Sequence, residues 1–279
     1  MGFDGCWSQI DIAGAHRDAA ITEWNTYVER DPHRVQLHMD DDGHGTLFVY
    51  EYEQVPEIID AHVAEMLLAL RRALDECVHQ VAVNDTGGDV DPPVRFPIAA
   101  TPEGFAANEH QIQALSDKHR GWVEAVQPYQ SEAGAEATTL YWLDRLVNTD
   151  RNSPMDRVVA AVVSEVELLV DAPNAKSVLF EDVGVPVVLE DGEAVVARFH
   201  VVPYARGDEV NPNPDLAVDP DILEWAASDT PNAGINRFRL GDRLTMMEQA
   251  VTIFVGRFER SCTGATRIDD LLHPEPDED

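Results

Sequence analysis

The stretch PEIIDAHVAEMLLALRRALDECVHQVAV, residues 56–83, decides the fold class of this chain. Its apolar side chains recur every three or four residues and form one broad stripe, which is the pattern of a helix with one face in a core. Pro56 suits the first turn, because its fixed φ is preorganised for a helix. The stripe consists of Ile59, Val63, Met66, Leu67, Leu70, Leu74, Cys77, Val78 and Val81. We predict that this segment is the strongest helix of the chain.

Toward the N-terminus the sequence predicts a further helix and a β-hairpin. Helical spacing of apolar side chains extends over residues 9–30 and stops at Asp31-Pro32. Two β-prone runs, residues 34–39 and 46–53, flank the turn-forming sequence DDGHG. We therefore expect a hairpin over about residues 34–53.

After the strong helix, a polar loop over residues 85–93 precedes a short predicted strand at 94–98. Thr101-Pro102 is a helix-start signal, because threonine caps helices and proline is tolerated in the first turn. Further helical segments are predicted at 102–107, 109–126 and 138–149.

The chain changes character after Ser153-Pro154, which is itself a helix-start signal. Residues 162–170 alternate between apolar and polar positions with the period of two that is typical of a strand. Further strand-like runs lie at 177–182, 185–190, 194–202 and, as an added edge, 216–225. This half is expected to be mostly antiparallel sheet.

A last helix, capped by Asp242, is predicted to close the second half and to pack on the sheet. The fold class expected is α+β, with a helical N-terminal half that contains an inserted β-hairpin and an antiparallel, β-rich C-terminal half closed by a helix. The corresponding division is 1–157, 158–262 and an acidic tail over 263–279, in one compact unit.

The charge of the chain restricts its partners. Twenty Lys and Arg stand against 52 Asp and Glu, which gives a formal net charge of −32, and only Lys118 and Lys176 are lysines. This pattern fits either a protein kept soluble in high salt or a genome that favours Arg, Asp and Ala codons. A field of this sign repels phosphate backbones and anionic membranes, so nucleic acid is an unlikely partner and no membrane association is expected. A protein partner or a homodimer is expected instead.

The cysteines and the N-terminus indicate a cytoplasmic protein. Cys6, Cys77 and Cys262 are an odd number without paired spacing, which favours a reducing compartment over a disulfide framework. Cys77 falls on the apolar stripe and is predicted to be a buried free thiol. Residues 1–15 have neither the basic start nor the apolar run of a secretory signal, and the most apolar stretch, 158–170, is too short to span a bilayer.

Two sequence patterns imitate metal sites. His33, His38 and His44 lie near Asp40 to Asp42 and could hold a divalent metal across the hairpin. A solvated polar turn and an exposed strand face explain these residues without a metal, and this second interpretation is favoured. The segment that begins at Asn211 imitates a calcium loop but has leucine and isoleucine where the loop needs glycine and glutamate, so it is interpreted as a proline-rich surface loop. No metal and no cofactor are expected.

The strong helix carries the one constellation with a mechanism attached. Arg72 and His79 are seven positions apart and therefore lie on one helix face, about 10.5 Å apart along the axis. Together they could hold a phosphate and transfer a proton. The pairs Arg71–Asp75, Arg72–Glu76 and Asp75–His79 are also what an ordinary solvated helix face presents, and this second interpretation is favoured.

A series of short motifs over about residues 56–152 resembles a family of uncharacterised bacterial and phage-associated proteins. The motifs are LRRALD at 70–75, RFPI at 95–98, QPY at 127–129, and LYWL at 140–143 followed by Asn148-Thr-Asp150. The arginine-to-histidine spacing is similar to that of HEPN-type proteins, which are helical dimers that cleave RNA without metal or bind nucleotides.

The HEPN resemblance implies that Arg72 steadies a phosphate and that His79 acts as a general acid or base. The chain departs from the family pattern where Glu76 and Asn152 replace histidines and Ala69 replaces asparagine. A carboxylate at Glu76 repels an anionic substrate.

Two functions of different classes follow from the sequence. The first is a noncatalytic interaction or regulatory protein, which the charge and the missing histidines favour, so that the balance leans against an enzyme. The alternative is a HEPN-like, metal-independent ribonuclease or nucleotide-binding protein that uses Arg72 and His79.

Overall fold

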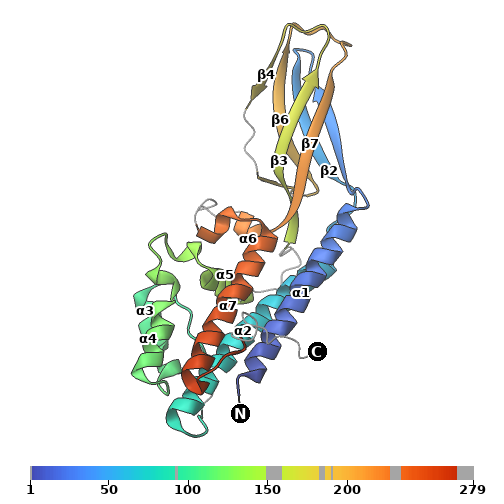
Figure 1. Ribbon diagram of the computed structural model, residues 1–279. Helices are drawn as coiled ribbons and strands as arrows, with labels where there is room; N and C mark the ends of the chain where they lie inside the picture. Colours follow the sequence, from blue (N-terminus) through green and yellow to red (C-terminus); the bar gives the residue numbers. More distant parts are fainter. Residues whose placement is uncertain are drawn as a thin grey trace, which may run out of the picture. The chain divides into compact units, whose positions relative to one another are not determined.

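The computed structural model of the protein describes residues 2–91, 94–148, 159–181, 186–189, 191–226 and 234–268 (Figure 1). The fold class is α+β, as predicted, with antiparallel sheets, an inserted hairpin and a closing helix. The chain forms two compact units, which are described separately. The helical unit comprises residues 1–20, 61–153 and 230–279, and the β unit comprises 21–60 and 154–229. The sequence predicted two consecutive halves that divide at residue 157. Each observed unit instead combines segments that are distant in the sequence.

The predicted helices are present, with shifted ends. The longest two are α1 (Asp4–Val28) and α2 (Glu57–Thr86). The other α-helices in the described ranges are α3 (Pro102–Asn108), α4 (Asp117–Ala125), α5 (Thr139–Asn148), α6 (Leu223–Ala226) and α7 (Leu240–Thr263). Short 3-10 helices are η1 (Glu109–Ile112), η2 (Pro128–Gln130), η3 (Ala135–Ala137) and η4 (Gly234–Arg237). Among the described residues, no helix is both long and apolar enough to cross a membrane.

Helix α2 is the helix that the sequence predicted, and its apolar stripe is buried. Each of the nine stripe side chains is at most 2% exposed. Helix α1 lies alongside α2, because a Cβ atom added at Gly5 would lie 2.6 Å from the Glu76 carboxylate. Helix α1 also contacts α7, where Gly14 faces Glu248. Burial of each large apolar side chain contributes about 1.5–3 kcal/mol, so burial of this stripe stabilises the fold strongly.

The prediction that the closing helix packs on the sheet is wrong. Helix α7 belongs to the helical unit, where it contacts α5 and where Phe254 packs edge-to-face on Phe96 with ring centroids 4.9 Å apart. It begins at Leu240 after the N-cap residue Arg239, so Asp242 lies in the first turn and is not the cap. The apolar spacing predicted the helix correctly but could not identify its partner.

The short strand predicted at residues 94–98 is not formed. Residues 94–98 have no regular secondary structure, and side chains of α2 bind the backbone of Phe96. The Phe96 amide donates to Asp75 Oδ1 at 2.9 Å, and Arg71 donates to the Phe96 carbonyl at 2.7 Å. Arg71 also lies 3.2 Å from Asp75, which joins the three groups in one network.

The helix predicted over 109–126 is interrupted. It consists of η1 and α4 with a turn between them. The helix-start signal at Ser153-Pro154 and the tail from His273 lie outside the described residues.

The β unit contains two antiparallel sheets. The first has the order β1-β2-β6-β4, with β1 (His33–Met39), β2 (His44–Glu51), β4 (Ser177–Glu181) and β6 (Glu193–Val202). The second has the order β5-β3-β7, with β3 (Val159–Asp171), β5 (Val187–Val188) and β7 (Asn211–Ile222). The predicted hairpin is confirmed as β1–β2, and Gly43 adopts a φ of +90° in its turn. Leu47, Val49 and Phe199 point into the core with no exposed surface.

The prediction of a proline-rich surface loop at residues 211–215 is wrong. This segment is the first part of β7 and pairs with β3 from Asn211 to Ile222. Proline cannot donate to a ladder, and it is tolerated in strands that have one unpaired edge. In the described sheet β7 is such an edge strand, so Pro212 and Pro214 are compatible with it.

All three cysteines are free thiols, and the prediction that Cys77 is buried is confirmed. Cys6 and Cys77 have no exposed surface. Burial, together with a hydrogen bond between the Cys77 and Cys6 thiols, raises the pKa of Cys77, and burial raises the pKa of Cys262 to about 11. The thiols of Cys77 and Cys262 are therefore protonated at neutral pH and are weak nucleophiles.

Tyr27 links α1 to strand β2 inside the β unit. Its hydroxyl lies 2.9 Å from Glu51 Oε1 and 2.8 Å from the Glu53 carbonyl oxygen, and the residue has no exposed surface. Burial and the neighbouring carboxylate of Glu51 raise the pKa of Tyr27, so the hydroxyl stays protonated and donates.

We expect Tyr27→Phe to lower the free energy of unfolding by about 1–2 kcal/mol, because the Glu51 and Glu53 oxygens lose a buried donor. Urea denaturation measures the change. The matched control is Tyr52→Phe at a side chain that is 65% exposed, which should leave stability unchanged. Equal stability of the two variants contradicts the prediction.

Candidate functional site

The structure does not bring Arg72 and His79 together in a described cavity. Arg72 is exposed, as predicted, whereas His79 is half-buried and its buried Nδ1 has no hydrogen-bond partner among the described residues. Neither residue lines the two pockets described below. Of the three predicted pairs, Arg71–Asp75 forms. The Glu76 carboxylate instead lies over Gly5 of α1.

The three histidines of the hairpin region have separate partners. His33 packs edge-on against Tyr27, His38 contacts Phe48 with ring centroids 4.8 Å apart, and His44 stacks on His200 at 4.2 Å. Within the described ranges, no group of three or more His, Cys, Asp or Glu side chains is placed to hold a metal ion. The hairpin therefore presents aromatic packing and not a ligand set.

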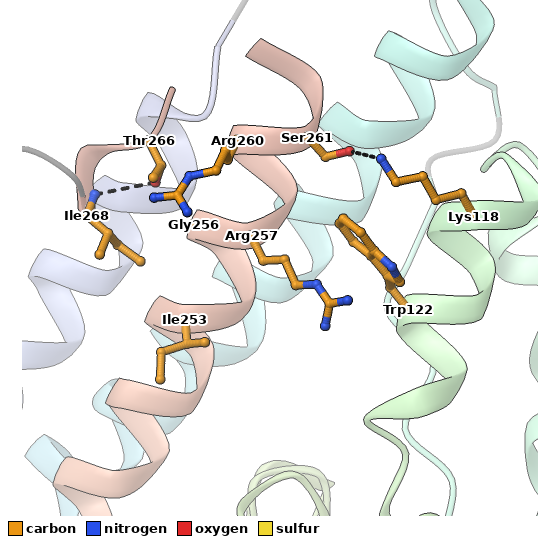
Figure 2. Close-up of a pocket in the computed structure, with 9 residues that line it drawn as sticks. All are labelled: Lys118, Trp122, Ile253, Gly256, Arg257, Arg260, Ser261, Thr266 and Ile268. Atoms are coloured by element: carbon orange, nitrogen blue, oxygen red, sulfur yellow. Dashed lines mark hydrogen bonds between the residues drawn. The ribbon is translucent and has the colours of Figure 1, made fainter. Parts of the chain in front are cut away.

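A pocket of about 420 Å³ lies in the helical unit between α4 and α7 (Figure 2). Its volume is within the range of small-molecule sites in proteins. Helix α4 contributes Lys118 and Trp122, and Figure 2 shows the indole reaching toward α7. The remaining lining residues come from α7 and the segment after it: Ile253, Gly256, Arg257, Arg260, Ser261, Thr266 and Ile268.

The described lining of this pocket is cationic, although the chain as a whole is acidic. Its described lining holds three cations, Lys118, Arg257 and Arg260, and no carboxylate. The Arg257 guanidinium carbon lies 4.0 Å from the centroid of the Trp122 ring, and the Lys118 ammonium lies 4.8 Å from it. In the part of the chain that the structure describes, neither Lys118 nor Arg257 pairs with a carboxylate. Cation–π contact with Trp122 holds both charges in place, and Lys118 also donates a hydrogen bond to Ser261.

Two isoleucines add apolar surface to the wall. Ile253 is 65% exposed and lines the pocket. Ile268 packs closely on α7, because a Cβ atom at Gly256 would lie 2.2 Å from Ile268 Cδ1. The pocket thus combines cationic groups with an aliphatic surface.

Ser261 in the pocket wall belongs to a hydrogen-bonded relay. Its Oγ lies 2.9 Å from Nε2 of His119, and Nδ1 of His119 lies 2.7 Å from Oδ2 of Asp85. Lys118 Nζ donates to the same Ser261 Oγ at 2.8 Å. The residues come from the end of α2, from α4 and from the end of α7. We call Asp85, His119 and Ser261 the relay.

Burial and hydrogen bonds fix the charge state of Asp85. Burial opposes ionisation, but the Ser116 amide, which donates to Oδ2 at 2.7 Å, and His119 outweigh it, so that the pKa of Asp85 lies below its ordinary value. An ionised Asp85 favours the His119 tautomer with its proton on Nδ1. The Nε2 lone pair then faces Ser261. His119 is only 4% exposed and packs against the rings of Trp122 and Phe258.

This arrangement has the atom order of a Ser-His-Asp triad, which is recognised by geometry and roles rather than by sequence position. A hydroxyl hydrogen-bonded to a histidine that a carboxylate orients is the signature of an activated nucleophile. The same contacts also join three helix segments and contribute to stability.

Sequence reasoning missed the relay because its members are 34 and 142 positions apart. Asp85 was assigned to a polar loop, and His119 was one of several polar residues in a predicted helix. The available signal was weak: Lys118 is one of only two lysines in the chain and lies beside His119 and near Trp122.

A second pocket of the helical unit, between α1 and the end of α7, has its charges paired. Arg267 donates to both carboxylate oxygens of Asp11, at 3.0 and 3.1 Å. Trp7 Nε1 donates to Glu259, which also accepts from the Arg267 amide. These groups satisfy one another, so the charges of Asp11, Glu259 and Arg267 in this pocket are engaged within the protein.

Comparison with family models, with curated proteins and with solved structures finds no match for this chain.

We expect Asp85→Asn to lower the free energy of unfolding by roughly 2 kcal/mol at neutral pH, because a buried charged acceptor is lost. The folded-state pKa of Asp85 is below its unfolded value of about 3.9, so its contribution is present above that pH and is lost as the pH falls through the folded pKa. The difference in the free energy of unfolding between Asp85→Asn and the wild type should therefore narrow below about pH 4.

Urea denaturation over a pH series measures this difference. The control is Asp117→Asn, whose side chain is 95% exposed and whose ion pair with Arg120 contributes little. A difference that stays constant down to the acid unfolding limit contradicts the role of Asp85.

Proposed function

We propose that the protein is a binding protein whose helical unit takes up a small organic anion in the pocket at Trp122. This proposal gives a ligand class to the interaction or regulatory function that the sequence favoured. The observation that carries it is the lining itself, which gathers three cations and no carboxylate among its described residues.

A cationic lining is unexpected in a chain with so many carboxylates. With 52 carboxylates against 20 cations, a Lys or Arg side chain has many possible acidic partners. Lys118 and Arg257 nevertheless face a pocket and hold their positions through Trp122 and Ser261. Because the field of the whole chain repels anions, a local cluster is needed to bind one.

The lining also defines the shape of the ligand. The planar guanidinium of Arg257 suits a carboxylate or phosphate, to which it can donate two parallel hydrogen bonds. Ile253 and Ile268 offer aliphatic surface to the uncharged part. The ligand class is therefore an organic anion with an apolar or aromatic body.

The HEPN-like ribonuclease or nucleotide-binding function stays a prediction of the sequence, and no contact among the described residues favours it. Its test is the cleavage of a labelled RNA pool by the wild type and by a His79→Ala variant. Equal cleavage by both proteins removes it.

We expect 2-naphthoate to bind one site per chain and its neutral isostere 2-naphthamide to bind at least tenfold more weakly, as measured by isothermal titration calorimetry. Arg257→Gln should weaken 2-naphthoate about tenfold, since one charge-assisted contact contributes about 1.5–3 kcal/mol in a favourable site. Trp122→Leu should weaken it further, because the indole positions both cations.

The control is Arg206→Gln in the β unit, at a side chain that is 85% exposed, which should leave the affinity unchanged. Equal affinity for the acid and the amide, or no effect of Arg257→Gln, would show that the pocket does not select anions.

A further inference from the structure

The relay gives the pocket a chemical group that binding alone does not need. We propose that Ser261 is a nucleophile and that the pocket hydrolyses carboxylic esters of organic anions, with His119 as general base and Asp85 as the residue that orients it. This inference rests on the proposed anion binding for its substrate class. It goes beyond it by assigning a reaction.

The two hydrogen-bond partners of Ser261 Oγ determine where its hydroxyl hydrogen points. A serine hydroxyl has one hydrogen and two lone pairs. Lys118 is a pure donor, so at 2.8 Å its ammonium must occupy a lone pair of Oγ. The hydroxyl hydrogen is then free to point to His119 Nε2 at 2.9 Å. This is the arrangement in which the histidine can remove the proton as Oγ attacks.

The Nδ1 side of the His119 ring is also held in place. Asp85 accepts from His119 Nδ1 and from the Ser116 backbone amide, so its carboxylate cannot turn away without leaving an amide unsatisfied. Ser116 Oγ also lies 3.1 Å from Nδ1. The rings of Trp122 and Phe258 enclose the imidazole, which keeps water from competing for its nitrogen atoms. The relay is therefore held in place before any substrate arrives.

The reaction balances with water as the only other reactant. Ser261 Oγ forms a bond to the ester carbonyl carbon while its proton passes to His119 Nε2. The tetrahedral adduct collapses with cleavage of the bond to the alcohol oxygen, which takes the proton from His119. Water then attacks the acyl-Ser261 ester and gives its proton to His119. The acid leaves, and the proton returns to Ser261 Oγ.

Cationic side chains, rather than backbone amides, stabilise the negative charge of the tetrahedral adduct. Ser261 lies within α7, where backbone N–H groups are committed to the helix. Lys118 contacts Oγ directly, and Arg257 lines the same pocket. Flexible side chains stabilise an oxyanion less effectively than a preorganised pair of amides. The site should therefore favour esters with good leaving groups and turn over slowly.

The substrate pair that tests this inference is 3-acetoxy-4-nitrobenzoate and 2-nitrophenyl acetate, which release similar coloured phenolates but differ in the anionic group. We expect purified full-length protein to hydrolyse the anionic ester with a kcat/KM at least tenfold higher. Ser261→Ala should lower that value about a hundredfold, since general base and nucleophile are lost together. Thr245→Ala, which removes another hydroxyl of α7 outside the pocket, is the matched control and should not change it.

A second readout separates a nucleophile from a residue that only supports the fold. Acid quenching during turnover, followed by peptide mass spectrometry, should show an acetyl group on Ser261 in the wild type. Circular dichroism establishes that Ser261→Ala is folded. Equal hydrolysis by folded wild type and folded Ser261→Ala, or acetylation only at other residues, overturns the inference.

The two proposals fail separately. Binding of 2-naphthoate by the wild type without hydrolysis of 3-acetoxy-4-nitrobenzoate overturns the nucleophile and leaves the binding function standing. Hydrolysis that depends on Ser261 but shows no preference for the anionic ester, together with no binding of 2-naphthoate, leaves the nucleophile and removes the anion as its substrate class.

Discussion

The helical unit depends on the burial of one face of α2. Its nine apolar stripe residues are almost completely removed from water, and α1, α7 and the segment around Phe96 have to cover the helix. Polar groups at the edges of the stripe then fix these neighbours in place. Arg71 and Asp75 bind the backbone of Phe96, and Asp85 near the end of the helix binds the start of α4. The position of α2 therefore also determines the position of the relay.

A second constraint is electrostatic. A chain with a net charge of −32 should neutralise its few cations wherever they lie close to its carboxylates. Arg17 and Arg267 follow this rule through Glu248 and Asp11. Lys118 and Arg257 do not follow this rule. The indole of Trp122 contacts both cations, and the Ser261 hydroxyl accepts a hydrogen bond from Lys118. Among the described residues their charges stay available to a ligand, and the described lining of the pocket is cationic in a strongly acidic chain.

The β unit illustrates how far local patterns predict a fold. Alternation over 162–170 and the turn at Gly43 gave the correct strands and hairpin, since both depend on neighbouring residues. The segment at 94–98 has the composition of a strand but forms none, and α2 side chains bind the backbone of Phe96 instead. The segment from Asn211 has the composition of a loop but pairs with β3 as an edge strand. In both cases a distant partner decided the outcome.

The sequence by itself determined the fold class, the buried face of α2 and the outward position of Arg72, because helical and strand periodicities are properties of short stretches of chain. It also determined the net charge, and with it the need for a local cation cluster if an anion is to bind. Only the tertiary structure decided where α7 packs and that Asp85, His119 and Ser261 meet within hydrogen-bond distance. Residues 34 and 142 positions apart come together through the packing of helices, and that packing depends on the shapes of many buried side chains at once.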